Sequence, residues 1–181
     1  MTGPDARRPP TRGELRASAL RMLALREHGR AELERKLSRP RGAREAPPPA
    51  LLSQVLDELQ AQGLLDEARF AQALARRVAR RHGSLRVLGE LRRHGLDEAL
   101  VERAAGEALG ELEPESQRAL RLLLRHHPLP PADAAQRARQ MRFLQARGFG
   151  SDAIRAASPR PSSRPRTSSP PTSTAWATTP A

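Results

Sequence analysis

The sequence predicts an all-α fold, arranged as an array of three similar helix triplets. Residues 28–37 carry a His-Gly pair followed by two apolar positions four residues apart, and residues 82–91 repeat this pattern. Residues 91–101 carry a glycine set between apolar positions, and residues 144–154 repeat that pattern. We find no convincing period-2 alternation of the kind that predicts a strand. Self-similarity at a period of about fifty residues is typical of stacked helical repeats, which offer long binding surfaces.

The first predicted module covers residues 14–63. Residues 1–13 before it are rich in proline and arginine, so we expect a disordered arm. Helical periodicity begins near Glu14 and ends at Gly29, which suits the left-handed position that follows a helix.

Two further helices complete this module. The first of them is short and carries Leu33 and Leu37, and the second ends at Gly63. Between them, residues 38–49 contain four prolines and form a predicted irregular insertion.

The second predicted module covers residues 64–110. Asp66 is a candidate N-cap, because its carboxylate can accept from the free amides of the next helical turn. Phe70 starts an apolar stripe with helical spacing. Gly83 is expected to end this helix and Ser84 to cap the next.

The third predicted module covers residues 114–157. Pro114 suits the first helical position, where its missing N–H costs nothing. A helix is expected from about residue 132 to 147, and Ser151 is expected to cap a short last helix. The tail at residues 158–181 is mostly proline, serine, threonine, alanine and arginine, so we expect it to be disordered.

The chain is strongly basic and its positive charge is almost entirely arginine. Its 181 residues include 32 lysines and arginines against 20 acidic residues, and Lys36 is the single lysine. The planar guanidinium group matches carboxylates and phosphates in bidentate geometry. The partners indicated are therefore polyanions, either nucleic acid or an acidic protein groove.

Several classes of function are excluded or disfavoured by composition. The absence of cysteine excludes disulfides and thiolate metal sites. Four aromatic residues are too few for a protein that binds single strands by base stacking. The five histidines lack the spacing of a zinc site, and no nucleophile–base pair or phosphate-binding loop occurs, so we expect neither catalysis nor a cofactor nor a metal. No apolar run approaches the roughly 18 residues of a membrane span, and the N-terminus does not resemble a signal peptide.

One stretch of the sequence concentrates positive charge. Residues 76–93 contain seven arginines against the single acidic residue Glu90, which we also expect to pair with Arg86 one helical turn away. We call these arginines the central arginine cluster and take them as the candidate binding site; they are Arg76, Arg77, Arg80, Arg81, Arg86, Arg92 and Arg93. The alternative interpretation is an ordinary solvated helix face in an arginine-rich protein.

The segment Gly-Leu-Leu-Asp-Glu-Ala-Arg-Phe-Ala at residues 63–71 resembles the hallmark of the RecX family of recombination regulators. Three weaker matches occur in the family's order, within residues 31–37, 83–95 and 142–149. Together they cover about residues 15–157. The proline-rich insertion and the C-terminal tail depart from the family's pattern.

The resemblance implies three tandem three-helix modules in an extended, curved body without catalytic residues. It also implies a cytoplasmic protein, expected as a monomer off the membrane, that binds RecA and the RecA–single-stranded DNA filament. Weak non-specific DNA binding is a further expectation. The matched residues are mostly structural in this reading; they are Leu33, Leu37, Gly63, Leu64, Asp66, Phe70, Gly83, Leu91, Gly95, Phe143, Gly148 and Phe149.

A helix-turn-helix DNA-binding regulator is the alternative function. Each triplet could supply such a motif, but the candidate recognition helices carry several carboxylates. Glu32 and Glu34 lie beside Arg35 and Lys36 on the second helix of the first module, and Glu98, Glu102 and Glu107 lie on the last helix of the second. Carboxylates on a recognition helix suit the major groove poorly.

Overall fold

The computed structural model describes residues 8–40 and 45–158. Within these ranges the chain forms nine α-helices and no strand, which confirms the predicted all-α class. The predicted disordered tail from residue 159 onward, residues 1–7 of the predicted arm and residues 41–44 of the predicted insertion lie outside the described residues.

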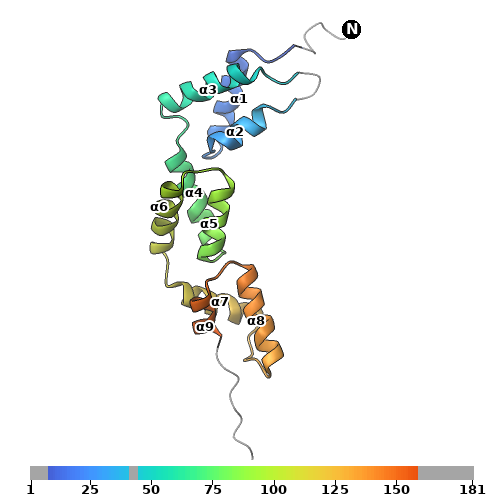
Figure 1. Ribbon diagram of the computed structural model, residues 1–181, viewed down its shortest axis with the longest axis vertical. Coiled ribbons are helices and arrows are strands. Elements are labelled where there is room, and N and C mark those ends of the chain that lie inside the picture. Colours follow the sequence, from blue (N-terminus) through green and yellow to red (C-terminus); the bar gives the residue numbers. More distant parts are fainter. Residues whose placement is uncertain (1–7, 41–44, 159–181) are drawn as a thin grey trace, which may run out of the picture.

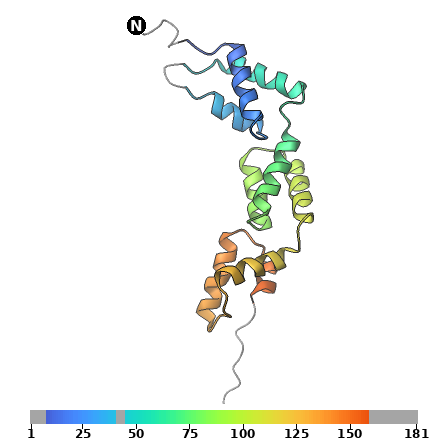
Figure 2. The same ribbon diagram turned by 180° about the vertical axis from the view of Figure 1, so that it is seen from behind.

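The helices divide into three groups of three. They are α1 (Arg12–Leu23), α2 (Arg30–Leu37), α3 (Pro49–Ala61), α4 (Glu67–Ala79), α5 (Ser84–Arg93), α6 (Glu98–Gly110), α7 (Glu115–His126), α8 (Ala134–Ala146) and α9 (Ser151–Ala157). Each group encloses its own apolar core, with Leu33 and Leu56 in the first, Leu74 and Leu91 in the second, and Leu144 among others in the third. Figures 1 and 2 show the groups one after another along the long axis, as an extended, curved array.

Three glycines end helices in the way that the sequence predicts. Gly63, Gly95 and Gly148 have positive φ angles of 66°, 72° and 76°, in the left-handed region that L residues with a β-carbon rarely adopt. Aspartates begin the helices that follow the first two. The Asp66 side chain accepts from the Ala68 and Arg69 amides, and Asp97 caps α6 in the same way.

Other predicted helix boundaries are wrong. Gly29 and Gly83 do not occupy left-handed positions, since their φ angles are −77° and −80° and each is the N-cap of the following helix. Their need for glycine comes from close contacts with the next module, described below. Ser84 and Ser151 do not cap helices either, because glycine holds the cap position before each of them. Pro114 is likewise the N-cap of α7 and not its first residue.

The first helix begins earlier than the periodicity predicts. Thr11 caps α1 in a capping box: its side chain accepts from the Glu14 amide, and the Glu14 carboxylate accepts from the Thr11 amide at 2.8 Å. The prediction of a disordered arm over residues 1–13 is therefore wrong at its end, since residues 12 and 13 belong to α1 and residues 8–11 lead into it. In the described part of the chain, every helix is too short or too polar to cross a membrane.

Candidate functional site

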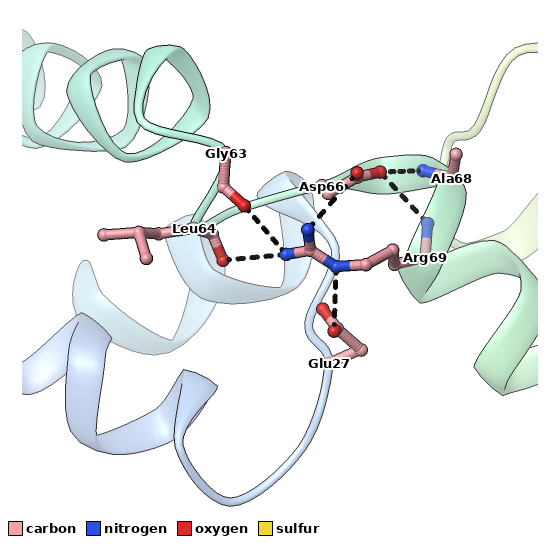
Figure 3. A network of polar contacts seen from close by, with 6 residues as sticks. All are labelled: Glu27, Gly63, Leu64, Asp66, Ala68 and Arg69. Atoms are coloured by element: carbon pink, nitrogen blue, oxygen red, sulfur yellow. Dashed lines mark hydrogen bonds and ion pairs between the residues drawn. The ribbon is translucent and has the colours of Figure 1, made fainter.

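The first joint, between the α1–α3 and α4–α6 modules, is held by a single arginine of the 63–71 motif. Figure 3 shows Arg69 reaching back from α4 to four groups, of which the Leu64 carbonyl is the most distant hydrogen-bond acceptor. Its Nε donates to Glu27 Oε1 at 3.0 Å, and one Nη donates to the Gly63 carbonyl at 2.9 Å. The other Nη lies 3.5 Å from Asp66 Oδ2. Arg69 thus fastens the turn after α1, the α3–α4 connection and the start of α4 to one another.

An aromatic ring fills the centre of the same joint. Phe70 is 2% exposed and packs edge-on against the His94 ring, with ring centroids 5.1 Å apart. A β-carbon on Gly29 would lie 2.8 Å from the ring, so only glycine fits the unshifted joint. The His-Gly turn of one module therefore sits directly on the first helix of the next.

The second joint, between the α4–α6 and α7–α9 modules, also involves a His-Gly turn, but here the turn contacts the α8–α9 connection through backbone atoms. The Gly83 amide donates to the Arg147 carbonyl and the Leu85 amide to the Gly148 carbonyl, both at 3.0 Å. A β-carbon on Gly83 would come within 2.5 Å of the Gly148 carbonyl carbon. The Ser84 amide also donates to Glu115 Oε1 at 2.6 Å. These contacts fix the position of the third module on the second.

A buried charge cluster supports the first His-Gly turn. Glu32 is 5% exposed and contacts three basic side chains: His28 Nδ1 at 3.1 Å, Lys36 Nζ at 2.8 Å, and the Arg26 guanidinium. Burial alone would raise the pKa of Glu32, but the contacts with these side chains, Arg26 foremost, outweigh it and hold the pKa far below its usual range. Burial lowers the pKa of His28, which favours the neutral imidazole.

The structure places the central arginine cluster on α4, α5 and the turn that joins them. Three of its members pair with carboxylates. Arg76 pairs with Glu111 at 2.6 Å, Arg92 with Glu98 at 3.1 Å, and Arg93 with Glu90 at 3.5 Å, the last in place of the expected pair with Arg86. Hydrogen bonds to these carboxylates raise the pKa of Arg76 and Arg92. Glu98 and Glu111 lie outside residues 76–93, so the positive charge there is less concentrated than the local count indicates.

The other four arginines of the cluster are exposed and make no ion pair among the described residues; they are Arg77, Arg80, Arg81 and Arg86. Arg80 and Arg81 face a recess at the second joint, where α7 adds further arginines that the sequence analysis did not single out. We call this hollow of ≈ 480 Å³ the joint recess, and its arginines are Arg80, Arg81, Arg118, Arg121, Arg125 and Arg147. Arg77 and Arg86 lie outside it.

Most of the matched structural residues lie in the cores or at the turns. Leu33, Leu37, Leu91 and Phe149 are buried. Leu64 is 41% exposed and contributes its carbonyl to the Arg69 contacts of Figure 3.

Phe143 is only partly buried. Its ring packs against His126 and His127, with centroids 5.1 and 5.5 Å away, and the Arg147 guanidinium lies 4.9 Å from its centre. The part of the chain that the structure describes contains no group of three residues placed to hold a metal ion.

Comparison with known proteins gives consistent matches in sequence. Residues 66–104 match the second three-helix domain of RecX, and residues 113–157 match the third. Regulatory protein RecX of Herbaspirillum seropedicae is 43% identical over 151 residues, which cover 83% of this chain and 91% of that protein. Regulatory protein RecX of Leptothrix cholodnii is 45% identical over 142 residues, with 78% and 85% covered.

Solved structures agree in fold. A crystal structure of regulatory protein RecX aligns with a TM-score of 0.58 at 21% identity, over 81% of this chain and 72% of that one. RecX from Lactobacillus salivarius aligns with a TM-score of 0.59 at 18% identity, over 81% and 93% of the two chains. At this level of identity the likeness concerns the fold.

Proposed function

The chain belongs to the RecX family of regulatory proteins, and we propose that it regulates RecA by binding the filament that RecA forms on single-stranded DNA. Binding in the helical groove of the filament mainly inhibits RecA. It lowers the recombinase, ATPase and coprotease activities of the filament. The 63–71 motif supports this partner through its resemblance to the RecX hallmark. The activity needs no catalytic residue and takes place in the cytoplasm, where the chain acts as a monomer.

The observation that carries the proposal is an extended array whose middle module is rich in arginine. Three modules in line suit a polymeric partner, because successive modules can contact successive protomers (Figure 1). The two joints support this reading, since Arg69 bonds to Glu27, Phe70 packs on Gly29, and the Gly83 turn bonds to the third module. A rigid array keeps its contacts in register with a regular partner.

The central arginine cluster supplies the proposed contacts. A single exposed ion pair contributes only about 0–1 kcal/mol. Several such pairs along one rigid body act together, because the first contact raises the effective concentration of the next. Arg77, Arg80, Arg81 and Arg86 are the members most available to acidic groups of RecA or to phosphates of the bound strand. The bulk of the array then obstructs filament motion, strand exchange and entry of coprotease substrates.

Charge reversal tests the contact surface. The variant Arg77→Glu/Arg86→Glu changes two exposed cluster residues and leaves the joint recess intact. Its control, Arg35→Glu/Arg142→Glu, makes the same change of charge at exposed positions of the first and third modules. Co-sedimentation with RecA–single-stranded DNA filaments should fall strongly for the first variant and little for the control. Equal binding by both variants would refute the assigned surface.

A further inference from the structure

The joint recess gathers positive charge from two modules. Arg80 and Arg81 come from the C-terminal end of α4, and Arg121 and Arg125 from α7. The residues that line it include two histidines and no acidic residue. Charges of one sign in a hollow with low-dielectric walls focus the local potential and attract ions of the opposite sign.

Arg118 is the unusual member of this recess, because it is buried without a carboxylate partner. Its exposure is 6%, and its Nη1 donates to the Ala79 carbonyl at 2.6 Å. Its Nε makes no hydrogen bond within residues 8–40 and 45–158, and no ion pair to Arg118 occurs there. Burial lowers the pKa of Arg118, and the carboxylates of Glu115 and Glu113 offset this only in part. A buried guanidinium without an opposite charge is costly for the fold.

A comparison of α4 with α7 bears on why residue 118 is an arginine. Glu67 and Glu115 are the first residues of α4 and α7, so Phe70 and Arg118 both occupy the fourth position of their helices. Phe70 packs in the core of its own module and against Gly29 of the module before it. At the same position of α7 the chain puts a buried cation, which donates to the Ala79 carbonyl of the module before it. An anionic ligand would account for this difference.

The chemistry of the recess favours phosphate over carboxylate as that anion. Guanidinium groups bind both, but the buried centres of protein–protein interfaces are depleted in charge. Protein–nucleic acid interfaces are more polar and much more positive. Six arginines line the recess, of which Arg121 is already paired with Glu113, and Ala79, Leu122 and Phe149 form its apolar lining. We propose that the joint recess binds the phosphate groups of a nucleic-acid strand.

Such a strand would also tie two modules together. It contacts Arg80 on the second module and Arg125 on the third, so binding stabilises the second joint. This site does not depend on RecA and can be measured on the isolated protein. Arg80 and Arg81 serve both proposals, so the readouts separate them: oligonucleotide binding without RecA tests the recess, and Arg77→Glu/Arg86→Glu, outside the recess, tests the contact with RecA.

Paired neutral variants test the site with the full-length chain. Arg80→Gln/Arg125→Gln removes one exposed arginine from each side of the recess, and neither residue makes an ion pair in the described chain. Arg103→Gln/Arg142→Gln removes two exposed arginines from the same two modules, outside the recess. Fluorescence anisotropy with a labelled twelve-residue oligothymidylate measures binding at several salt concentrations.

We expect the recess variant to bind at least about tenfold more weakly than wild type, and the control less than about twofold. Losing two phosphate contacts should reduce the slope of log K against log salt by about 1.4. Equal weakening in the two variants, or none in either, would overturn the proposal. So would full displacement of the oligonucleotide by a glutamate peptide of equal charge at equal concentration, since the recess would then be a site for protein carboxylates.

Arg118 provides a second test of the same proposal. Arg118→Met replaces the buried cation with an apolar chain, and we expect at least tenfold weaker oligonucleotide binding. The melting temperature should stay close to that of wild type, because removing the unpaired charge offsets the lost hydrogen bond to the Ala79 carbonyl. Binding that matches wild type would show that the buried guanidinium takes no part. If this variant fails to fold, the exposed pair still decides the question.

Discussion

The substitution Gly83→Ala tests whether the second joint is a rigid contact. Gly83 is buried, and a β-carbon there would overlap the backbone of Gly148 and Phe149. Its φ of −80° is open to alanine, so any cost comes from contact with the next module and not from backbone strain. Backbone atoms cannot move aside as a side chain can, so the third module must shift.

The expected cost follows from the contacts that this shift disturbs. The hydrogen bonds from the Gly83 and Leu85 amides to the third module contribute about 1 kcal/mol each. Inserting a methyl group into a close-packed contact costs about 1–3 kcal/mol. The two effects overlap, because moving the module relieves the clash while it breaks the bonds. We expect Gly83→Ala to lower the free energy of unfolding by about 3 kcal/mol, and the melting temperature by about 6–12 °C.

Thermal and urea unfolding followed by far-UV circular dichroism measure this cost, with Gly89→Ala as the matched control. Gly89 lies in the same helix, and a β-carbon there would meet nothing within 4 Å. Alanine at this position should stabilise the protein by about 0.5–1 kcal/mol, since glycine is unfavourable inside a helix. A Gly83→Ala protein as stable as Gly89→Ala would refute the rigid joint.

Three further predictions concern the first module and its joint. Gly29→Ala should cost about 1–2 kcal/mol, less than Gly83→Ala, because the Phe70 ring that it meets can turn aside; urea unfolding of the two variants gives the order. Glu32→Gln should cost about 2 kcal/mol at pH 7. Because the folded-state pKa of Glu32 is depressed, wild type keeps this advantage in full above about pH 4.3 and loses it progressively as the pH falls toward the folded-state pKa. The difference between the two proteins in urea titrations should therefore be smaller at pH 3 than at pH 7. Arg69→Ala should cost about 1 kcal/mol, and a double-mutant cycle with Glu27→Gln should show coupling of about 0.5 kcal/mol.

Local signals predicted much of the fold correctly. A glycine after a periodic apolar stretch indicated the helix end at Gly63, and an aspartate before the next stretch indicated the N-cap at Asp66. Both signals act within a few residues, so they are legible in a single sequence. The Thr11–Glu14 capping box is equally local, and its Thr-x-x-Glu pattern could have placed the start of α1 correctly.

Signals that depend on distant residues were misread. Gly29 and Gly83 look like helix-ending glycines, yet they are glycines because Phe70 and Gly148 approach them from the next module. Nothing within a few residues of either glycine distinguishes a left-handed turn from a close contact. Only the repeat of the His-Gly pair hinted that both serve one role in the array.

The candidate site shows the same division between local and distant information. Counting charges along residues 76–93 found a cluster of arginines, but not the carboxylates of Glu98 and Glu111 that fold back onto it. Such a count could not identify the joint recess, because Arg80 and Arg125 come together only when the third module packs on the second.

RecA-dependent ATP hydrolysis on single-stranded DNA tests the central claim most directly. The steady-state rate is measured while the full-length chain is titrated into preformed filaments at fixed salt. The account predicts a rate that falls as the chain is added, and falls much less with Arg77→Glu/Arg86→Glu. A rate that full-length protein in excess leaves unchanged would contradict it.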